Sequence, residues 1–138
     1  MVDDMSMNVL MLLIPKARVD FLFSDFTVRQ ALEKMEVHGY NMIPVIDRKT
    51  GVYQRSVQYG DILHYLLLHR LDFEDLERIP LSEIVSARTI RPVYSTADTK
   101  NMVDIIMDQN YVPVIDDKGV FIGIVTRKAI MSQFLVIK

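Results

Sequence analysis

The hydrophobic pattern of the first half predicts alternating strands and helices. Thr27 can cap a helix, with Gln30 completing a capping box, and Gly39 ends the same helix. Between them lies an apolar stripe at helical spacing, formed by Val28, Ala31, Leu32 and Met35. The other predicted elements are an extended segment at 18–23, strands at 42–46 and 52–57, and a helix at 59–70. The predicted order is strand, helix, strand, strand, helix.

The second half repeats this order. Thr96 precedes Pro113 by the same number of residues as Thr27 precedes Pro44, which predicts a second capped helix starting after Thr96. The apolar stripe of that helix is predicted to be Val103, Ile106 and Met107. The remaining predicted elements are an extended segment at 89–94, strands at 111–115 and 120–125, and a last helix from about residue 127.

A nearly identical phrase marks both copies. The letters PVID occur at 44–47 and again at 113–116, and a turn with a basic residue and a glycine follows each time. Such self-similarity indicates an internal duplication. We therefore predict an α/β (α+β) fold of two tandem repeats, each a small sheet with two helices. Because each sheet exposes an apolar face, the repeats are expected to pack as a pseudo-two-fold pair. The predicted boundaries are an N-terminal segment at 1–17, repeats at 18–70 and 88–138, and a linker at 71–87.

Two segments lie outside the repeats. The apolar run at 9–14 is far shorter than the ~20 residues of a membrane-spanning helix, and we expect it to pack on the domain. The linker is charged and is predicted to contain a short amphipathic helix after Pro80. Its sparse apolar spacing predicts lower local stability than that of the repeats.

Composition narrows the functional classes. The chain has 138 residues, half of them hydrophobic, with a formal net charge of −2, so no basic surplus indicates binding to a nucleic acid polymer. It has no cysteine, which excludes disulfides and thiolate chemistry and is compatible with a cytoplasmic protein. No membrane association is predicted. The sequence contains no Walker-type loop and no Gly-x-Ser-x-Gly motif, and His38, His64 and His69 lack metal-ligand spacing. We therefore predict neither an enzyme nor a metal site.

The repeat phrases resemble those of a CBS-domain pair, or Bateman module. The residues that carry the resemblance are IPVID with its glycine in the first copy and VPVIDDKGVFIGIVTRKAI in the second. It covers about 18–135. The chain is most similar to the stand-alone cyclic di-AMP-binding CBS proteins of Firmicutes, through LIPKARVDF, the linker and Thr126-Arg127-Lys128. The resemblance implies a regulatory nucleotide, and no cofactor, in a cleft between the copies.

The resemblance implies one main set of ligand-binding residues. They are Lys16, Arg18, Val19, Asp20, Tyr40, Asn41, Met42, Pro44, Thr126, Arg127 and Lys128. Several suit this chemistry: Tyr40 and Met42 offer apolar faces to a base, and a phosphate near Thr126 would meet free helix N–H groups. The structural alternatives are that Thr126 only caps the last helix, that Arg127 and Lys128 are simply solvated, and that Tyr40 belongs to the core.

A second, weaker set is implied for the symmetry-related cleft. It comprises Asp61, Arg88, Thr89, Asn110, Tyr111 and Pro113. Nucleotide-binding copies of the family usually carry an acid three residues after the threonine, where it contacts ribose. Here Ala129 occupies that position in the second copy, whereas Asp61 retains the acid in the first. The first set therefore favours a ligand with two phosphates, cyclic di-AMP, over AMP.

Three functions remain open. The first is a module that senses cyclic di-AMP, or another adenine nucleotide, and signals to an unidentified protein partner. The second is an AMP, ADP or ATP energy sensor that uses the Asp61 cleft. The third is a dimerisation module without a ligand. A homodimer is expected in any case, because the segment ILHYLLLH is more apolar than a small sheet needs for its cover.

Overall fold

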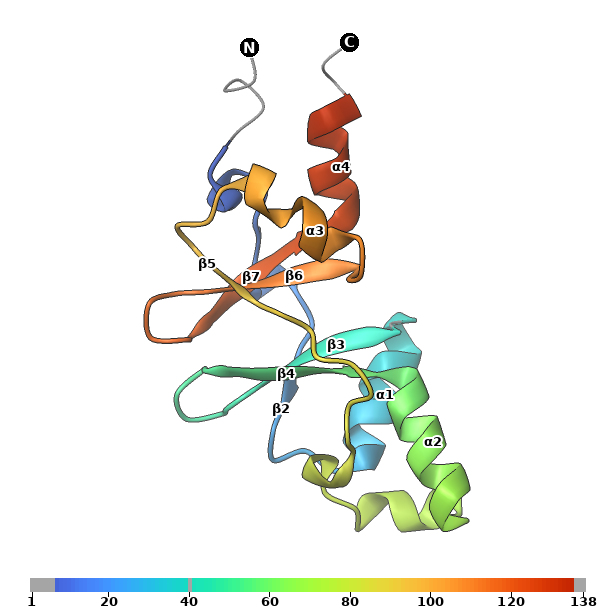
Figure 1. Cartoon of the computed structure of the whole chain (residues 1–138). Helices are drawn as coiled ribbons and strands as arrows, with labels where there is room; N and C mark the ends of the chain where they lie inside the picture. Colours follow the sequence, from blue (N-terminus) through green and yellow to red (C-terminus); the bar gives the residue numbers. More distant parts are fainter. Residues whose placement is uncertain (1–6, 40, 136–138) are drawn as a thin grey trace. The chain divides into compact units, whose positions relative to one another are not determined.

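The structure, a computed structural model, describes residues 7–39 and 41–135 and divides the chain into two compact units. Unit 1 combines the chain up to Val19 with the chain from Ile90 onward, and unit 2 is Asp20–Thr89. Both contain a sheet and helices, with four α-helices among the described residues (Figure 1). The predicted class of tandem α/β repeats is confirmed.

Unit 2 is built on a three-stranded sheet in the order β2–β3–β4. Strand β2 is parallel to β3, so α1 is the crossover between them, and β4 returns antiparallel to β3. The elements are β2 (Leu22–Phe23), α1 (Val28–His38), β3 (Met42–Ile46), β4 (Tyr53–Gln58), α2 (Tyr59–His69), and the 3₁₀ helices η4 (Phe73–Glu77) and η5 (Leu81–Glu83).

Unit 1 repeats this topology and adds one strand, giving the order β1–β7–β6–β5. Strand β5 is parallel to β6, and β7 is antiparallel to both β6 and β1. The elements are η2 (Val9–Met11), β1 (Ile14–Pro15), η3 (Lys16–Arg18), β5 (Val93–Tyr94), η6 (Thr99–Met102), α3 (Val103–Ile106), β6 (Tyr111–Ile115), β7 (Phe121–Thr126) and α4 (Arg127–Leu135).

Helix α1 starts and ends where its sequence predicts. The Thr27 hydroxyl accepts the backbone N–H of Gln30 at 3.2 Å, and the Gln30 side chain accepts that of Thr27 at 2.8 Å, which completes the capping box. Gly39 ends the helix with a left-handed backbone, φ 67°, a conformation that costs glycine little. The predicted apolar stripe is the buried face of the helix.

The predicted start of the corresponding helix in unit 1 is wrong. Asp98, not Thr96, is the N-cap, and its carboxylate accepts the backbone N–H of Lys100 at 3.3 Å. The helix begins as 3₁₀ turns in η6 and continues as the four-residue α3. Leu22 pairs with Val45 but Val93 pairs with Val114, so the second crossover is two residues shorter. Counting back from Pro113 therefore misplaced the cap.

The buried face of η6 and α3 also differs from the predicted apolar stripe. Thr99, Met102 and Ile106 are buried, whereas Val103 and Met107 are exposed. Of the three predicted core positions, only Ile106 is therefore in the core.

Each repeat packs against the segment that precedes the other repeat in the sequence. We call residues 7–19 the N-terminal lead-in and residues 79–89 the central lead-in. The central lead-in belongs to unit 2, where Val28 donates its N–H to Ile79 and Leu81 donates to Phe26, both at 2.8 Å. The N-terminal lead-in lies in unit 1, where Thr99 donates to Met7 and Val9 donates to Ala97. The apolar run at 9–14 thus packs on the domain, as predicted.

The linker is better packed than its sparse apolar spacing suggested. Leu76, Leu81 and Ile84 are fully buried in the core of unit 2 together with the stripe of α1. The predicted helix after Pro80 is the single 3₁₀ turn η5. Leu76 enters the core from η4, and Leu81 and Ile84 enter it from the two ends of the η5 turn.

Candidate functional site

The start of α4 is the corner of unit 1 where β7 turns into a helix. The Thr126 hydroxyl accepts the backbone N–H of Ala129 at 3.1 Å, so Thr126 caps the helix. The Arg127 guanidinium uses its Nε to donate to the backbone oxygens of Ile106 at 2.8 Å and Gln109 at 3.2 Å. Lys128 is exposed. Arg127 therefore stabilises the C-terminal end of α3 through these two carbonyl groups.

Residues predicted for different sites lie side by side at this corner. Tyr111 pairs with Thr126 across the β6–β7 ladder, and Arg127 donates its backbone N–H to Asn110 at 2.9 Å. Pro113 is buried two positions further along β6. Unit 1 thus brings together three residues of the main set, Thr126, Arg127 and Lys128, and three of the second set.

The N-terminal lead-in reaches β7 from its other edge. Ile14 pairs with Ile124 and Pro15 with Gly123, so the antiparallel register carries Lys16–Arg18 toward the Phe121 end of β7, away from Thr126. Gly123 is required at this point: a Cβ there would collide with the backbone oxygen of Ile14.

Unit 2 contains the equivalent corner, where β4 turns into α2. Met42 pairs with Gln58, and Tyr59 donates its backbone N–H to Asn41 at 2.8 Å. Pro44 is buried within β3. Asp20 lies elsewhere in the unit, 3.5 Å from the His38 ring nitrogen. Tyr40 lies outside the described residues.

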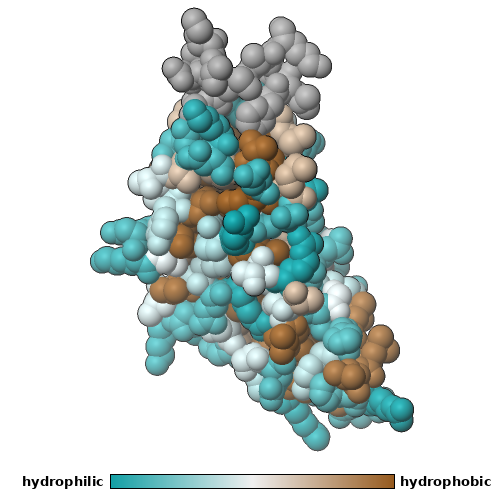
Figure 2. All heavy atoms as spheres, in the orientation of Figure 1, coloured by the Kyte–Doolittle hydropathy of each residue, from teal (hydrophilic) through white to brown (hydrophobic). Residues whose placement is uncertain are grey.

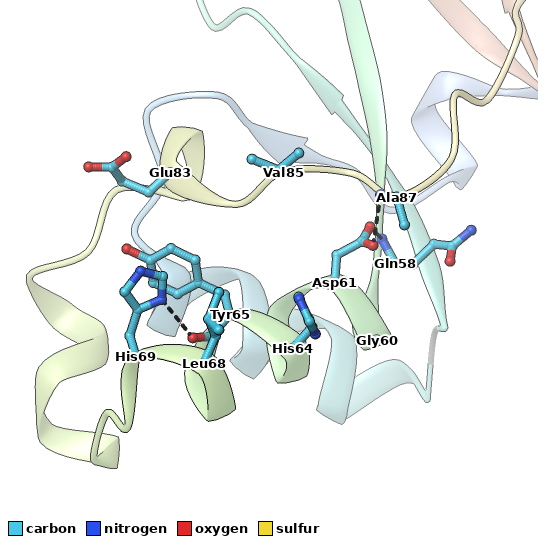
Figure 3. Close-up of a pocket in the computed structure, with 10 residues that line it drawn as sticks. All are labelled: Gln58, Gly60, Asp61, His64, Tyr65, Leu68, His69, Glu83, Val85 and Ala87. Atoms are coloured by element: carbon cyan, nitrogen blue, oxygen red, sulfur yellow. Dashed lines mark hydrogen bonds between the residues drawn. The ribbon is translucent and has the colours of Figure 1, made fainter.

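Asp61 is the buried acid of this corner, with only 7% of its surface exposed. One carboxylate oxygen accepts the backbone N–H of Gln58 and the other that of Ala87, both at 3.1 Å. Arg88 and Thr89 follow Ala87 directly and are exposed. Asp61 therefore joins the start of α2 to the central lead-in (Figure 3).

Arg55 attaches the same lead-in to β4. Its guanidinium donates to the backbone oxygens of Ile84 at 2.5 Å and Leu81 at 2.9 Å, and to the Ser86 hydroxyl at 3.0 Å. Burial lowers the pKa of Arg55, and the charge of Asp61 partly opposes that shift. Sequence reasoning did not identify Arg55, because a lone arginine in an alternating strand looks like a solvent-facing residue.

A pocket of about 680 Å³ lies between α2 and the central lead-in (Figure 3). Gln58, Gly60, Asp61 and Ala87 line one end, and Tyr65, Leu68 and Val85 give it an apolar body. The remaining lining residues are His64, His69 and Glu83. The Tyr65 and His69 rings stack with centroids 4.1 Å apart. Asp61 is the one residue of this pocket that was predicted from the sequence as a ligand contact, because one wall comes from a distant segment.

Residues 7–39 and 41–135 contain no group of three or more acidic, histidine or cysteine side chains suited to a metal ion. Within the same residues, no helix has the length and apolar character required to cross a membrane.

Comparison with known proteins identifies the fold. Residues 81–135 match the family model of the CBS domain. A CBS domain-containing protein of unknown function from Bacillus anthracis is 23% identical, with a TM-score of 0.85 over 100% of both chains. No relative was found among the curated proteins.

Two further structures contain nucleotides. CbpB from Listeria monocytogenes, solved in complex with c-di-AMP, is 23% identical, with a TM-score of 0.79 over 93% of this chain and 95% of that one. The CBS domain of a bacterial CNNM/CorC family Mg²⁺ transporter, solved with ATP, is 18% identical, with a TM-score of 0.74 over 93% and 87%. At these identities the likeness concerns the fold. Residues 81–135 therefore have the sequence pattern of the CBS domain, and the chain has the fold of known CBS-domain structures.

Proposed function

We propose that the chain is a cytoplasmic regulatory module that binds cyclic di-AMP and passes its binding state to a protein partner. The observation that carries the proposal is the cationic start of α4. Arg127 and Lys128 follow the capping Thr126, and Ala129 stands where an acid would face the ligand. A phosphate placed here gains from the helix N-terminus and from charge-assisted contacts, and no carboxylate at 129 repels it.

The structural likeness to CbpB supports this ligand class, because that protein was solved with c-di-AMP. The corner also brings backbone groups of β6 close to this position. Tyr111 pairs with Thr126, and Pro113, which has no backbone N–H to donate, follows two positions along β6. Polar backbone and an aromatic ring thus stand next to the proposed phosphate position.

Calorimetric titration of the purified chain with cyclic di-AMP, AMP and ATP tests the proposal. We expect cyclic di-AMP to bind most tightly. Tighter binding of AMP or ATP would contradict the proposal and favour the energy-sensor function. If none of the three nucleotides produces binding heat, the dimerisation module without a ligand becomes the better function.

One observation favours the energy-sensor alternative. The pocket beside α2 has Asp61 at one end, and a buried carboxylate is a suitable acceptor for ribose hydroxyls. A CBS relative solved with ATP has the same fold. The two functions differ in the corner they use, so variants of Arg127 and Asp61 separate them.

We further propose that the chain forms a homodimer through α2. Its Leu63, Leu67 and Leu68 are 42%, 79% and 66% exposed, and Phe73 nearby is 62% exposed. Figure 2 shows hydrophobic surface gathered over this region. Such a patch is covered most simply by the same patch of a second copy. Sedimentation at micromolar concentration tests this, and a purely monomeric chain would contradict it.

A further inference from the structure

Gln109 is a buried polar side chain in unit 1 that the proposed function does not use. It is 3% exposed and lies between α3 and β6. Its side-chain oxygen accepts the backbone N–H of Arg91 at 2.7 Å. Its side-chain nitrogen donates to the backbone oxygens of Arg91 and Tyr111, both at 3.1 Å. A buried amide with three such bonds fixes the position of each group it contacts.

The side chain replaces backbone pairing at a point where two strands have separated. The β5–β6 ladder begins at Val93 and Val114, and Arg91 lies just before it. The Gln109 amide contacts both the N–H and the C=O of Arg91, as a neighbouring strand would, and also contacts Tyr111 on β6. The segment that leads into β5 is therefore attached to the start of β6 by one side chain.

The backbone of the same residue connects to the corner of α4. The Gln109 carbonyl accepts the guanidinium Nε of Arg127, and the carbonyl of the next residue, Asn110, accepts the Arg127 backbone N–H. Gln109 thus connects the corner that holds two proposed ligand residues to the backbone of Arg91. Arg127 and Asn110 are on one side, and on the other is Arg91, two residues after Thr89 in the chain.

We propose that Gln109 is the positioning residue of the nucleotide site: its amide sets the spacing between the segment leading into β5 and the β6–α4 corner. This inference rests on the proposed function. Gln109 does not touch the ligand, because it is buried. It acts by fixing Tyr111 and the chain around Arg91, and by presenting the carbonyl that orients Arg127.

The test compares Gln109→Met, which keeps the length of the side chain but removes all three hydrogen bonds, with wild type in titrations with cyclic di-AMP. Gln54→Met is the matched control, because Gln54 is an exposed residue of β4. Titrations are run well below the melting temperature of each variant, so that global stability does not enter the affinity. We expect Gln109→Met to weaken binding about tenfold or more, the effect of losing one or two hydrogen bonds, and Gln54→Met to bind like wild type.

A second variant separates positioning from simple structural loss. Gln109→Glu retains the acceptor for Arg91 but at pH 7.5 directs a carboxylate at two carbonyl oxygens. At pH 5.5 the buried carboxyl is protonated more and regains a donor. The charged residues bonded at this position are Arg91, through its backbone, and Arg127, which donates to the backbone carbonyl. We expect the affinity of Gln109→Glu, relative to wild type, to recover about threefold or more between these pH values.

The outcomes are distinct. If wild type binds cyclic di-AMP and folded Gln109→Met binds equally well, the positioning role is wrong and the proposed function stands. If wild type binds none of the nucleotides, both are wrong. If Gln109→Met does not fold, Gln109→Glu decides alone, and a pH profile parallel to that of wild type overturns the positioning role.

Discussion

The two units hold their lead-in segments in different ways at equivalent positions. In unit 1, Gly123 lets the N-terminal lead-in approach β7 closely enough to pair with it as strand β1. In unit 2 the same ladder position is Arg55, whose guanidinium binds the carbonyls of the central lead-in through its side chain. The acid that follows differs too: Asp61 accepts the N–H of Ala87, whereas the matching residue in unit 1 is Ala129.

This difference shows how the two copies of a duplicated fold can diverge in side-chain chemistry while three strands keep the same order. Backbone pairing at Gly123 uses no side chain and leaves the α4 corner without an acid. The side-chain attachment in unit 2 needs a cation and an acid, and it leaves a pocket beside α2. We therefore expect the attachment of the N-terminal lead-in to unit 1 to depend on backbone geometry, and the attachment of the central lead-in to unit 2 to depend on charged side chains.

The largest expected effect is on the backbone attachment. Gly123→Val forces a branched side chain against the Ile14 carbonyl, and we expect a loss of about 3 kcal/mol in unfolding free energy, the upper range for overpacking. Thermal and denaturant melting measure it. Gly60→Ala is the control, because a Cβ there meets no atom within 4 Å, and replacing a helical glycine should stabilise by about 0.5–1 kcal/mol. Equal effects of the two variants would refute the close-approach argument.

Ligand binding should separate the two corners. Arg127→Ala is expected to weaken cyclic di-AMP binding by about 1.5–3 kcal/mol, the scale of hydrogen bonds to a charged group, and Asp61→Ala to change it little. Calorimetric titration measures both. Because Arg127 also binds the Ile106 and Gln109 carbonyls, melting curves must show that the variant is folded. The reverse ranking would assign binding to the Asp61 corner and favour the energy sensor.

Alkaline pH should destabilise unit 2 at a position where unit 1 carries no ionisable group. Burial raises the pKa of Tyr53 to about 12, with the Ser56 hydroxyl opposing the shift, and the matching residue in unit 1 is Phe121. A raised folded-state pKa gives stability that is complete below pH 10 and is lost between about pH 10 and 12, at most about 2–3 kcal/mol. Denaturant melting at pH 8 and 11.5 tests this, and Tyr53→Phe should remove the Tyr53 contribution. An unchanged pH dependence in that variant would show that Tyr53 is not responsible.

The smallest expected effect is on the side-chain attachment. Arg55→Met should cost about 1–2 kcal/mol, because the Leu81 and Ile84 carbonyls lose their donor but Arg55 is only half-buried. Hydrogen exchange should be faster near the central lead-in and unchanged in β6 and β7. Uniform acceleration in both units would instead indicate that Arg55 contributes to global stability.

Much of the fold could be predicted from the sequence, because its signals are local. The Thr27–Gln30 capping box, the Gly39 terminus and the strand-turn-strand phrases depend on neighbouring residues, and the structure confirms them. The α3 region failed for the same reason. The start of its helix was placed by counting back from Pro113, and only the pairing of β5 with β6 reveals the two-residue shortening.

The candidate site was predictable only in part. The sequence shows a helix-capping threonine followed by two basic residues, Thr126, Arg127 and Lys128. The structure places these residues at the start of α4. Arg55 and Gln109 were not visible, since each stands between two polar residues, which is typical of a solvent-facing position. Apart from Tyr111, which is two residues from Gln109, their partners are 18 to 31 residues away in the chain.

The sequence by itself determined the duplication, the order of strands and helices within each repeat, and the chemical contrast between Ala129 and Asp61, because each can be recognised from the types of neighbouring residues. Only the tertiary structure decided which lead-in packs on which repeat, that Gly123 and Arg55 perform the same attachment by different means, and that Arg127 caps α3 while Gln109 joins Arg91 to β6. These features depend on backbone groups that are brought together from distant parts of the chain. Every residue has a carbonyl group and nearly every residue has an N–H, so the sequence does not show which of these groups become partners.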